Sequence, residues 1–94
     1  MTYYVCFAKN YDAWPPVKDM LRVEADDPQA AIEQVLREGN GPTDKRLRCA
    51  MALTITGKLK SVANVFWLNF DGGLSRLNGW TYSSYPGPAT LIDP

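Results

Sequence analysis

The sequence predicts a small α+β domain, a two-layer sandwich in which one helix packs on a mostly antiparallel sheet of four to five strands. Two observations lead to this prediction. Several segments alternate between apolar and polar residues, as strands do, and one segment carries both a helix start and a helix stop. The chain has 94 residues, 46 % of them hydrophobic, which suffices for one core but not for a second domain. We therefore place one domain at residues 1–82 and an extended C-terminal tail at residues 83–94.

The N-terminal part contains two predicted strands and a loop between them. Residues 2–8 are rich in β-branched and aromatic types and alternate with a period of two. Both faces of this strand are apolar, so the pattern does not select the side that faces the core. Residues 10–16 include consecutive prolines, which a central strand excludes, and they are expected to form a loop. Residues 20–25 alternate apolar and charged side chains, as in a half-exposed strand.

The helix has the clearest local signals in the chain. Asp27 is suited to cap the free amides of the first turn, Pro28 suits the first helical position, and Gly39 suits the left-handed stop. One stripe of this helix is apolar and is expected to face the sheet: Ala31, Ile32, Val35 and Leu36.

Three strands are predicted after the helix. In residues 47–55 every odd position is apolar, so we expect the odd positions to pack under the helix, with Gly57-Lys58 as the hairpin turn that follows. Residues 62–70 form the next strand, and a glycine-rich turn at residues 71–73 leads to a last strand at residues 74–82. Asn78-Gly79 predicts a break or a bulge in that last strand.

The sequence lacks the residue patterns of common enzyme and metal sites. It contains no histidine, which removes the most frequent general base and metal ligand. Asp26 and Asp27 lie where a helix cap is needed, and the glycines fall in β turns instead of a strand-to-helix phosphate loop. We predict a non-catalytic protein without cofactor or metal. The alternative is an enzyme or small-ligand carrier whose site is built from carboxylates. Four acidic residues could contribute to such a site: Asp12, Asp19, Glu24 and Asp71.

The cysteines and the apolar runs bear on location. We expect Cys6 and Cys49 to be buried thiols in a reducing compartment, with a disulfide as the alternative if the fold brings their Cα atoms within about 7 Å. The longest apolar runs are far shorter than the roughly 20 residues of a membrane-spanning helix. The first residues also lack a signal-peptide pattern. The expected location is the cytoplasm, without membrane association.

Charge is distributed unevenly, although the net charge is zero. Residues 1–44 hold four basic and eight acidic side chains, whereas residues 45–76 hold six basic and one acidic. We expect Arg46 and Arg48 to project from one face of the same strand, with the remaining basic residues near it: Lys58, Lys60 and Arg76. This basic face predicts a polyanion site, and with nearby aromatic residues a nucleic-acid-binding module; the alternative is a solvated side of the sheet.

Aromatic residues in the first loop suggest a protein interface. Tyr11 and Trp14 stand beside Pro15-Pro16, and both residue types commonly anchor interfaces; the alternative is that Trp14 folds back over the sheet. We predict a small binding protein that covers or bridges a protein partner, of the kind of regulator or inhibitor that mobile genetic elements encode. Tyr11, Trp14 and the basic face would make the contacts. Pairing of an exposed edge strand with its twin leaves a homodimer open.

Overall fold

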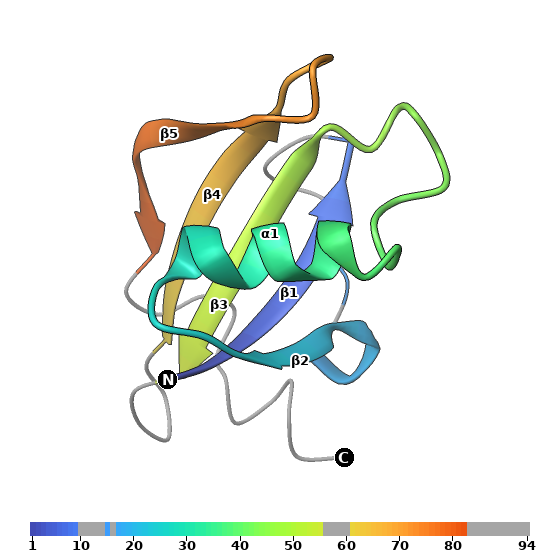
Figure 1. Cartoon of the computed structure of the whole chain (residues 1–94). Coiled ribbons are helices and arrows are strands. Elements are labelled where there is room, and N and C mark those ends of the chain that lie inside the picture. The colour runs from blue at the N-terminus through green and yellow to red at the C-terminus, as the bar shows by residue number, and fades with distance from the viewer. Residues whose placement is uncertain (10–14, 16, 56–60, 83–94) are drawn as a thin grey trace.

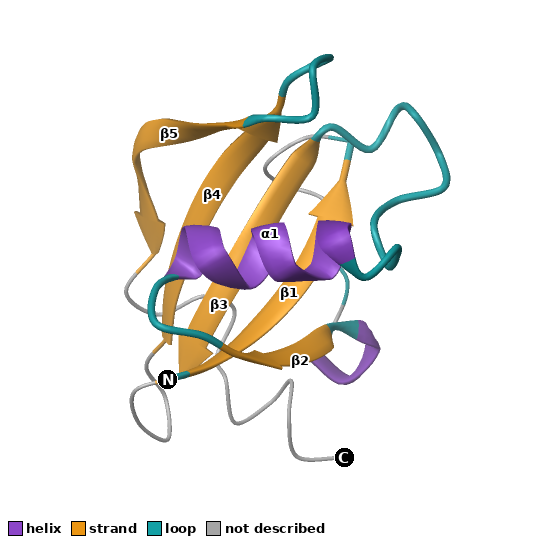
Figure 2. Ribbon diagram, in the orientation of Figure 1, coloured by secondary structure: helices purple, strands orange, loops and turns teal. Residues whose placement is uncertain are grey.

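The structure is a computed structural model that describes residues 1–9, 15, 17–55 and 61–82, with only the backbone considered at residues 55, 61 and 76–82. Within these residues it contains one α-helix, one short 3-10 helix and five strands (Figures 1 and 2). In chain order the elements are β1 (Thr2–Ala8), η1 (Val17–Asp19), β2 (Leu21–Glu24), α1 (Pro28–Arg37), β3 (Cys49–Ile55), β4 (Ser61–Leu68) and β5 (Leu74–Tyr82).

The strands form a single sheet in the order β2-β1-β3-β4-β5, and all neighbouring strands are antiparallel. Because β2 and β3 lie on opposite sides of β1 and both run antiparallel to it, they are parallel to each other. The connection between them contains α1, which lies across β1 and β3 on one face of the sheet (Figure 1). This confirms the predicted α+β architecture.

The helix begins and ends where its sequence predicts. The Asp27 side chain accepts a hydrogen bond from the backbone N–H of Ala30 at 2.7 Å, and Pro28 occupies the first turn. At the other end Gly39 adopts a φ of 77°, which a residue with a side chain rarely adopts. The N–H of Asn40 then donates to the carbonyl of Val35 at 3.0 Å, which closes the last turn.

The central strands of the sheet have a buried core on each face. The core between the sheet and α1 contains Tyr3, Val5, Val23, Ala31, Ile32, Val35, Ala50, Ala52 and Phe66. The core on the opposite face contains Cys6, Val17, Met20, Met51, Leu53, Ala63 and Val65. The apolar character of both sides of residues 2–8, which left the core side undecided, therefore reflects a strand with a core on each face.

The prediction that the odd positions of residues 47–55 pack under the helix is wrong. Ala50 and Ala52 belong to the core beneath α1, whereas Met51 and Leu53 belong to the core on the other face. The physical reason is space, because the small alanine side chains leave room for the branched side chains of the helix. The larger side chains fill the opposite face, where η1 supplies Val17.

The last two strands differ from the predicted ones in two details. β4 ends at Leu68, two residues earlier than predicted, because a turn begins at Asn69. Phe66 pairs with Arg76 and Asn64 pairs with Thr81, so residues 77–80 of β5 lie opposite a single residue of β4. This irregularity contains Asn78-Gly79, where the sequence predicts a break or a bulge. The Gly57-Lys58 turn and the tail at residues 83–94 lie outside the described residues.

Candidate functional site

The structure describes the side chains of two of the predicted contact residues, Arg46 and Arg48. The backbone of Arg76 lies in β5 opposite Phe66, and its side chain is outside the described part. The other predicted residues also lie outside the described ranges: Tyr11, Trp14, Lys58 and Lys60. The candidate site is therefore built from the surroundings of the two arginines.

The prediction that Arg46 and Arg48 lie on a strand is wrong. Both lie in the connection that precedes β3. The Asp44 side chain accepts a hydrogen bond from the backbone N–H of Arg46 at 2.9 Å, and the N–H of Leu47 donates to the carbonyl of Asp44 at 3.0 Å. This local turn delays the start of the strand. The alternative of a solvated strand face also fails for β3, because residues 49–54 are buried on both faces.

The charge of Arg46 is balanced by Asp44. The Arg46 guanidinium and the Asp44 carboxylate approach to 2.9 Å, and Arg46 Nε donates to the same carboxylate at 3.1 Å. The hydrogen bond from the Arg46 side chain lowers the pKa of Asp44 from 3.8 to about 2. The same hydrogen bond raises the pKa of Arg46. Arg46 is therefore a weaker candidate for binding an external anion than the sequence suggests.

Arg48 has a different environment, in which its side chain closes the end of the sheet. The N–H of Leu68 donates to the carbonyl of Arg48 at 2.7 Å, and the Arg48 guanidinium donates in return to the carbonyl of Leu68. The guanidinium carbon stacks 3.7 Å from the centre of the Phe70 ring and lies 5.7 Å from the centre of the Trp67 ring. We call Arg48, Trp67 and Phe70 the Arg48 cluster.

Phe70 is the most unusual member of this cluster, because 96 % of its surface is exposed. It lies in a turn fixed by hydrogen bonds: Asn69 N–H donates to the Gly73 carbonyl at 2.9 Å, and Gly73 N–H donates to the Asp71 side chain at 2.8 Å. Gly72 has a φ of 91°, which the turn requires. The aromatic ring is thus exposed to solvent, and its position is set by the hydrogen-bonded turn and by contact with the Arg48 side chain. Trp67 beside it is 38 % exposed.

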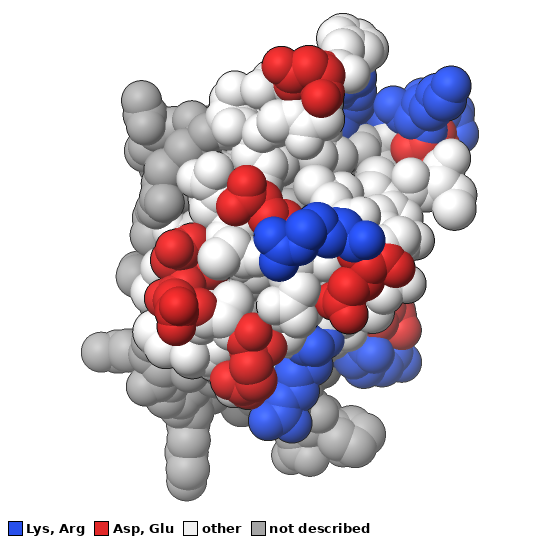
Figure 3. All heavy atoms as spheres, in the orientation of Figure 1, with Lys and Arg blue, Asp and Glu red and all other residues white. Residues whose placement is uncertain are grey.

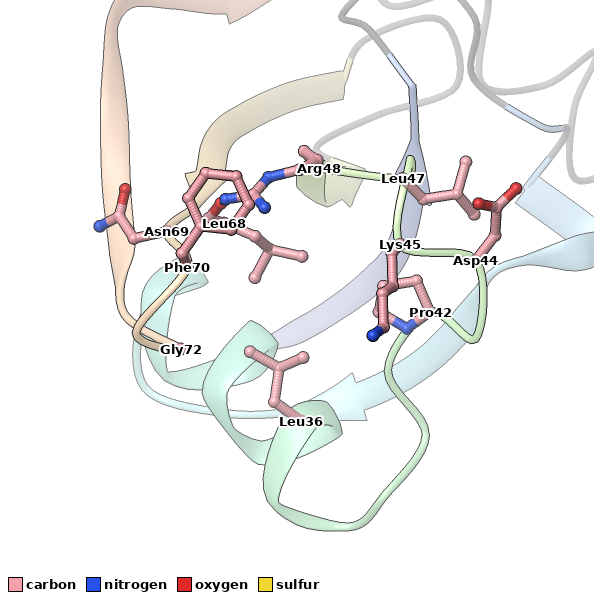
Figure 4. Close-up of a pocket in the computed structure, with 10 residues that line it drawn as sticks. All are labelled: Leu36, Pro42, Asp44, Lys45, Leu47, Arg48, Leu68, Asn69, Phe70 and Gly72. Carbon is pink, nitrogen blue, oxygen red and sulfur yellow. The ribbon is translucent and has the colours of Figure 1, made fainter.

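A hollow of about 480 Å³ lies next to the cluster, between the end of α1 and the ends of β3 and β4 (Figure 4). Figure 4 shows Leu36 rising from the helix on one side and Phe70 with Leu68 on another. The turn after β4 also supplies Asn69 and Gly72, and the rest of the wall comes from the connection before β3: Pro42, Asp44, Lys45, Leu47 and Arg48. Gly41 lets this connection pass close to the helix, because a Cβ there would lie 2.8 Å from Leu36 Cδ2.

The hollow carries an excess of positive charge. Its charged lining residues are Lys45, Arg48 and Asp44, and the Asp44 carboxylate is already paired with Arg46. Neither Lys45 nor Arg48 has an acidic partner among the described residues. On the helix-bearing face as a whole, acidic and basic side chains are interspersed, so this excess is local (Figure 3).

Sequence reasoning missed Phe70, Lys45 and Leu36 as members of one site. The alternation of residues 62–70 predicts Phe70 at the end of a strand, although Asn69 and Asp71 on either side of it are turn-forming residues and the strand ends before it. Leu36 was assigned to the core stripe and is only half-buried. No local signal joins Leu36 to Phe70, because they meet only through the packing of α1 on the sheet.

The two thiols do not contribute an accessible reactive group. Cys6 and Cys49 are both free and buried. Burial raises the pKa of Cys6 from 9.0 to about 12 and also raises the pKa of Cys49. Cys6 pairs with Met51 and Cys49 pairs with Ala8, so the thiols are diagonal neighbours on two strands. This confirms the expected buried thiols.

Within the described ranges, no group of three or more acidic or cysteine side chains is arranged to hold a metal ion. No helix in this part of the chain is long and apolar enough to cross a membrane. Comparisons with models of protein families, with curated protein sequences and with solved structures found no significant match to this chain.

Proposed function

We propose that this chain is a small non-catalytic binding protein that covers or bridges a protein partner, and that the Arg48 cluster makes the first contact. The observation that carries the proposal is the exposed ring of Phe70, which stacks on the guanidinium of Arg48. Large aromatic and arginine side chains dominate binding energy at protein interfaces.

The geometry favours binding at low entropic cost. The turn at residues 69–73 is already ordered by its own hydrogen bonds, so little backbone freedom is lost when a partner covers it. Full burial of the Phe70 side chain would contribute roughly 1.5–3 kcal/mol. The exposed ring lies beside a cation and a hollow. This small surface therefore offers apolar area, positive charge and a concave shape to a partner.

Two further features are consistent with this proposal. The sequence has no histidine, and free buried thiols are typical of proteins in a reducing compartment such as the cytoplasm. In this proposal the chain acts by association, as a regulator or inhibitor that blocks or links its partner. Encoding by a mobile genetic element belongs to the same proposal and rests on size alone.

Binding of single-stranded nucleic acid is the second candidate function. Exposed aromatic rings beside arginine and lysine also suit stacking with bases and contact with phosphates. Phe70, Trp67, Arg48 and Lys45 provide this combination. The two candidates differ in their response to nuclease and to salt, because phosphate neutralisation releases counterions.

A site-specific crosslinking experiment tests the proposal. A photoreactive phenylalanine analogue is placed at Phe70 and, as a matched control, at Gln29, which is exposed on the helix. Each protein is irradiated in lysate of the native host with and without nuclease. A discrete protein adduct that forms from position 70, survives nuclease and is absent from position 29 supports a protein partner. Adducts that disappear with nuclease favour the nucleic-acid candidate, and equal adducts from both positions would show that the cluster is not the contact.

The captured protein then allows a quantitative test. Phe70→Ala should weaken its binding by about 30-fold, the effect of losing one interface hot spot of about 2 kcal/mol. Gln29→Ala should leave the affinity unchanged. Both variants should remain folded, because Phe70 and Gln29 are exposed. Circular dichroism measures this. An affinity unaffected by Phe70→Ala would remove the cluster from the interface.

A further inference from the structure

The hollow beside the Arg48 cluster combines apolar walls with unbalanced positive charge. Leu36, Leu47 and Leu68 supply apolar surface, and the exposed Phe70 ring borders it. Its volume of about 480 Å³ falls within the range of roughly 300–1,000 Å³ typical of ligand sites. An apolar group of moderate size would therefore find both space and contact area.

The cations at this hollow have bonding capacity left. Among the described residues the Arg48 guanidinium makes one side-chain hydrogen bond, from Nη2 to the Leu68 carbonyl. Its Nε is buried and out of reach of a ligand, so the donor that remains for one is Nη1. Lys45 forms no ion pair within the same residues. The single carboxylate in the lining, from Asp44, is already bound to Arg46.

The missing element is thus an external carboxylate attached to an apolar group. A guanidinium N–H forms a charge-assisted hydrogen bond with a carboxylate, and a lysine adds a second positive charge. Phosphate would satisfy the charges but would leave the leucine walls without a partner. Because the hollow is continuous with the exposed Phe70 ring, a chain segment that covers Phe70 would extend into it.

We propose that this hollow binds a short acidic segment of a partner protein in which an aspartate or glutamate stands next to a large apolar residue. The carboxylate pairs with Lys45 and Arg48, and the apolar side chain lies against Leu36 and Leu47. This inference rests on the proposed function and specifies the chemistry of the partner.

Selection from a phage-displayed library of random heptapeptides on the immobilised chain tests the inference without prior choice of sequence. We expect the selected peptides to be enriched in aspartate or glutamate beside leucine, isoleucine, phenylalanine or methionine. In amide NMR spectra a synthetic copy of the best peptide should shift Leu36, Leu47 and Gly72. Selected peptides without acidic enrichment, a failure to select any peptide, or shifts confined to β2 would each overturn the inference.

A double-mutant cycle tests the charge contact directly. Calorimetry compares the selected peptide with a version in which each acidic residue is replaced by its amide. The amide version should bind about tenfold more weakly, because it loses its charge-assisted contacts. Lys45→Gln should weaken the acidic peptide about fivefold and leave the amide peptide nearly unchanged. Lys18→Gln is the matched control, because Lys18 is an exposed lysine on η1 outside the hollow, and it should change neither affinity. Equal effects of Lys45→Gln on both peptides would overturn the assigned pairing.

The outcomes separate this inference from the function on which it rests. Acidic peptides that bind in the hollow while position 70 captures no protein would support the inference and contradict the proposed function. Capture of a protein at position 70, together with peptide binding that does not depend on carboxylates, would support the proposed function and contradict the inference.

Discussion

At the residue scale, Arg48 links the end of the sheet to the exposed surface. Its guanidinium bonds the Leu68 carbonyl at the end of the β3–β4 pair and supports the Phe70 ring at 3.7 Å. A planar guanidinium suits both contacts, because it stacks flat against the ring while a terminal N–H donates to the carbonyl, whereas a lysine ammonium does not stack in this way. Arg48 therefore both contacts the end of the sheet and supports the exposed Phe70 ring.

Arg48→Lys should destabilise the fold although it preserves the charge. Losing the stacking and part of the bonding to the Leu68 carbonyl should lower the free energy of unfolding by about 1 kcal/mol, or about 4–8 °C in Tm for a domain of this size. Urea and thermal unfolding measure both quantities. Arg46→Lys is the control and should change stability by less than about 0.5 kcal/mol, because Arg46 is exposed. Equal effects of the two substitutions would contradict the role given to Arg48.

Asp44 should titrate in an unusual pH range. The Arg46 hydrogen bond favours the charged carboxylate in the fold and lowers its pKa from 3.8 to about 2. The resulting stabilisation is present above pH 3.8 and is lost as the pH falls from 3.8 towards 2, where the folded state also takes up the proton. Carbon-detected NMR of the Asp44 carboxyl should show a midpoint near 2, and Arg46→Ala should return it towards 3.8. A midpoint near 3.8 in the unsubstituted chain would show that the pair does not form in solution.

At the element scale, the helix end and the turn after β4 together form the site. α1 ends at Arg37 and brings Leu36 to one side of the hollow, while the turn at residues 69–73 brings Phe70 to the other. Each element is fixed by its own local hydrogen bonds. The hollow exists because the last turn of the helix and the turn after β4 both border the space beside the beginning of β3.

Asp27→Ala should test how much the helix depends on its cap. The side chain of Asp27 satisfies the N–H of Ala30, and loss of such a cap typically costs about 1 kcal/mol. Asp27→Ser should retain most of the stability because its hydroxyl accepts the same hydrogen bond. Asp26→Ala, at an exposed neighbour that caps nothing in the described structure, should have little effect in the same urea experiment. A loss of stability from Asp26→Ala as large as that from Asp27→Ala would indicate a general charge effect in place of capping.

At the scale of the whole molecule, the sheet separates two cores of different character. The core beneath α1 contains small residues of β3, and the core on the opposite face contains the larger ones. A strand with both faces buried has no solvated side, so its alternation of residue sizes matters more than its alternation of polarity.

Substitutions on the two faces of β3 should reveal this arrangement. Ala52→Leu should destabilise the fold by about 1–3 kcal/mol because the added volume meets α1. Leu53→Ala should cost about 2–5 kcal/mol because it leaves a cavity in the other core. Glu33→Ala, on the exposed side of the helix, should change stability by less than about 0.5 kcal/mol. If the face with Ala52 were solvated, Ala52→Leu would be nearly neutral in urea unfolding.

The sequence by itself determined the elements whose signals are local. The helix from Pro28 to Arg37, the first strand, the turn after β4 and the bulge in β5 all follow from caps, glycines and periodicity within short segments. The tertiary structure alone decided which face of β3 lies under the helix, because that choice depends on the space between two elements distant in sequence. It also decided the candidate site, since Leu36, Arg48 and Phe70 carry no common local signal and line one hollow only because the helix packs on the sheet.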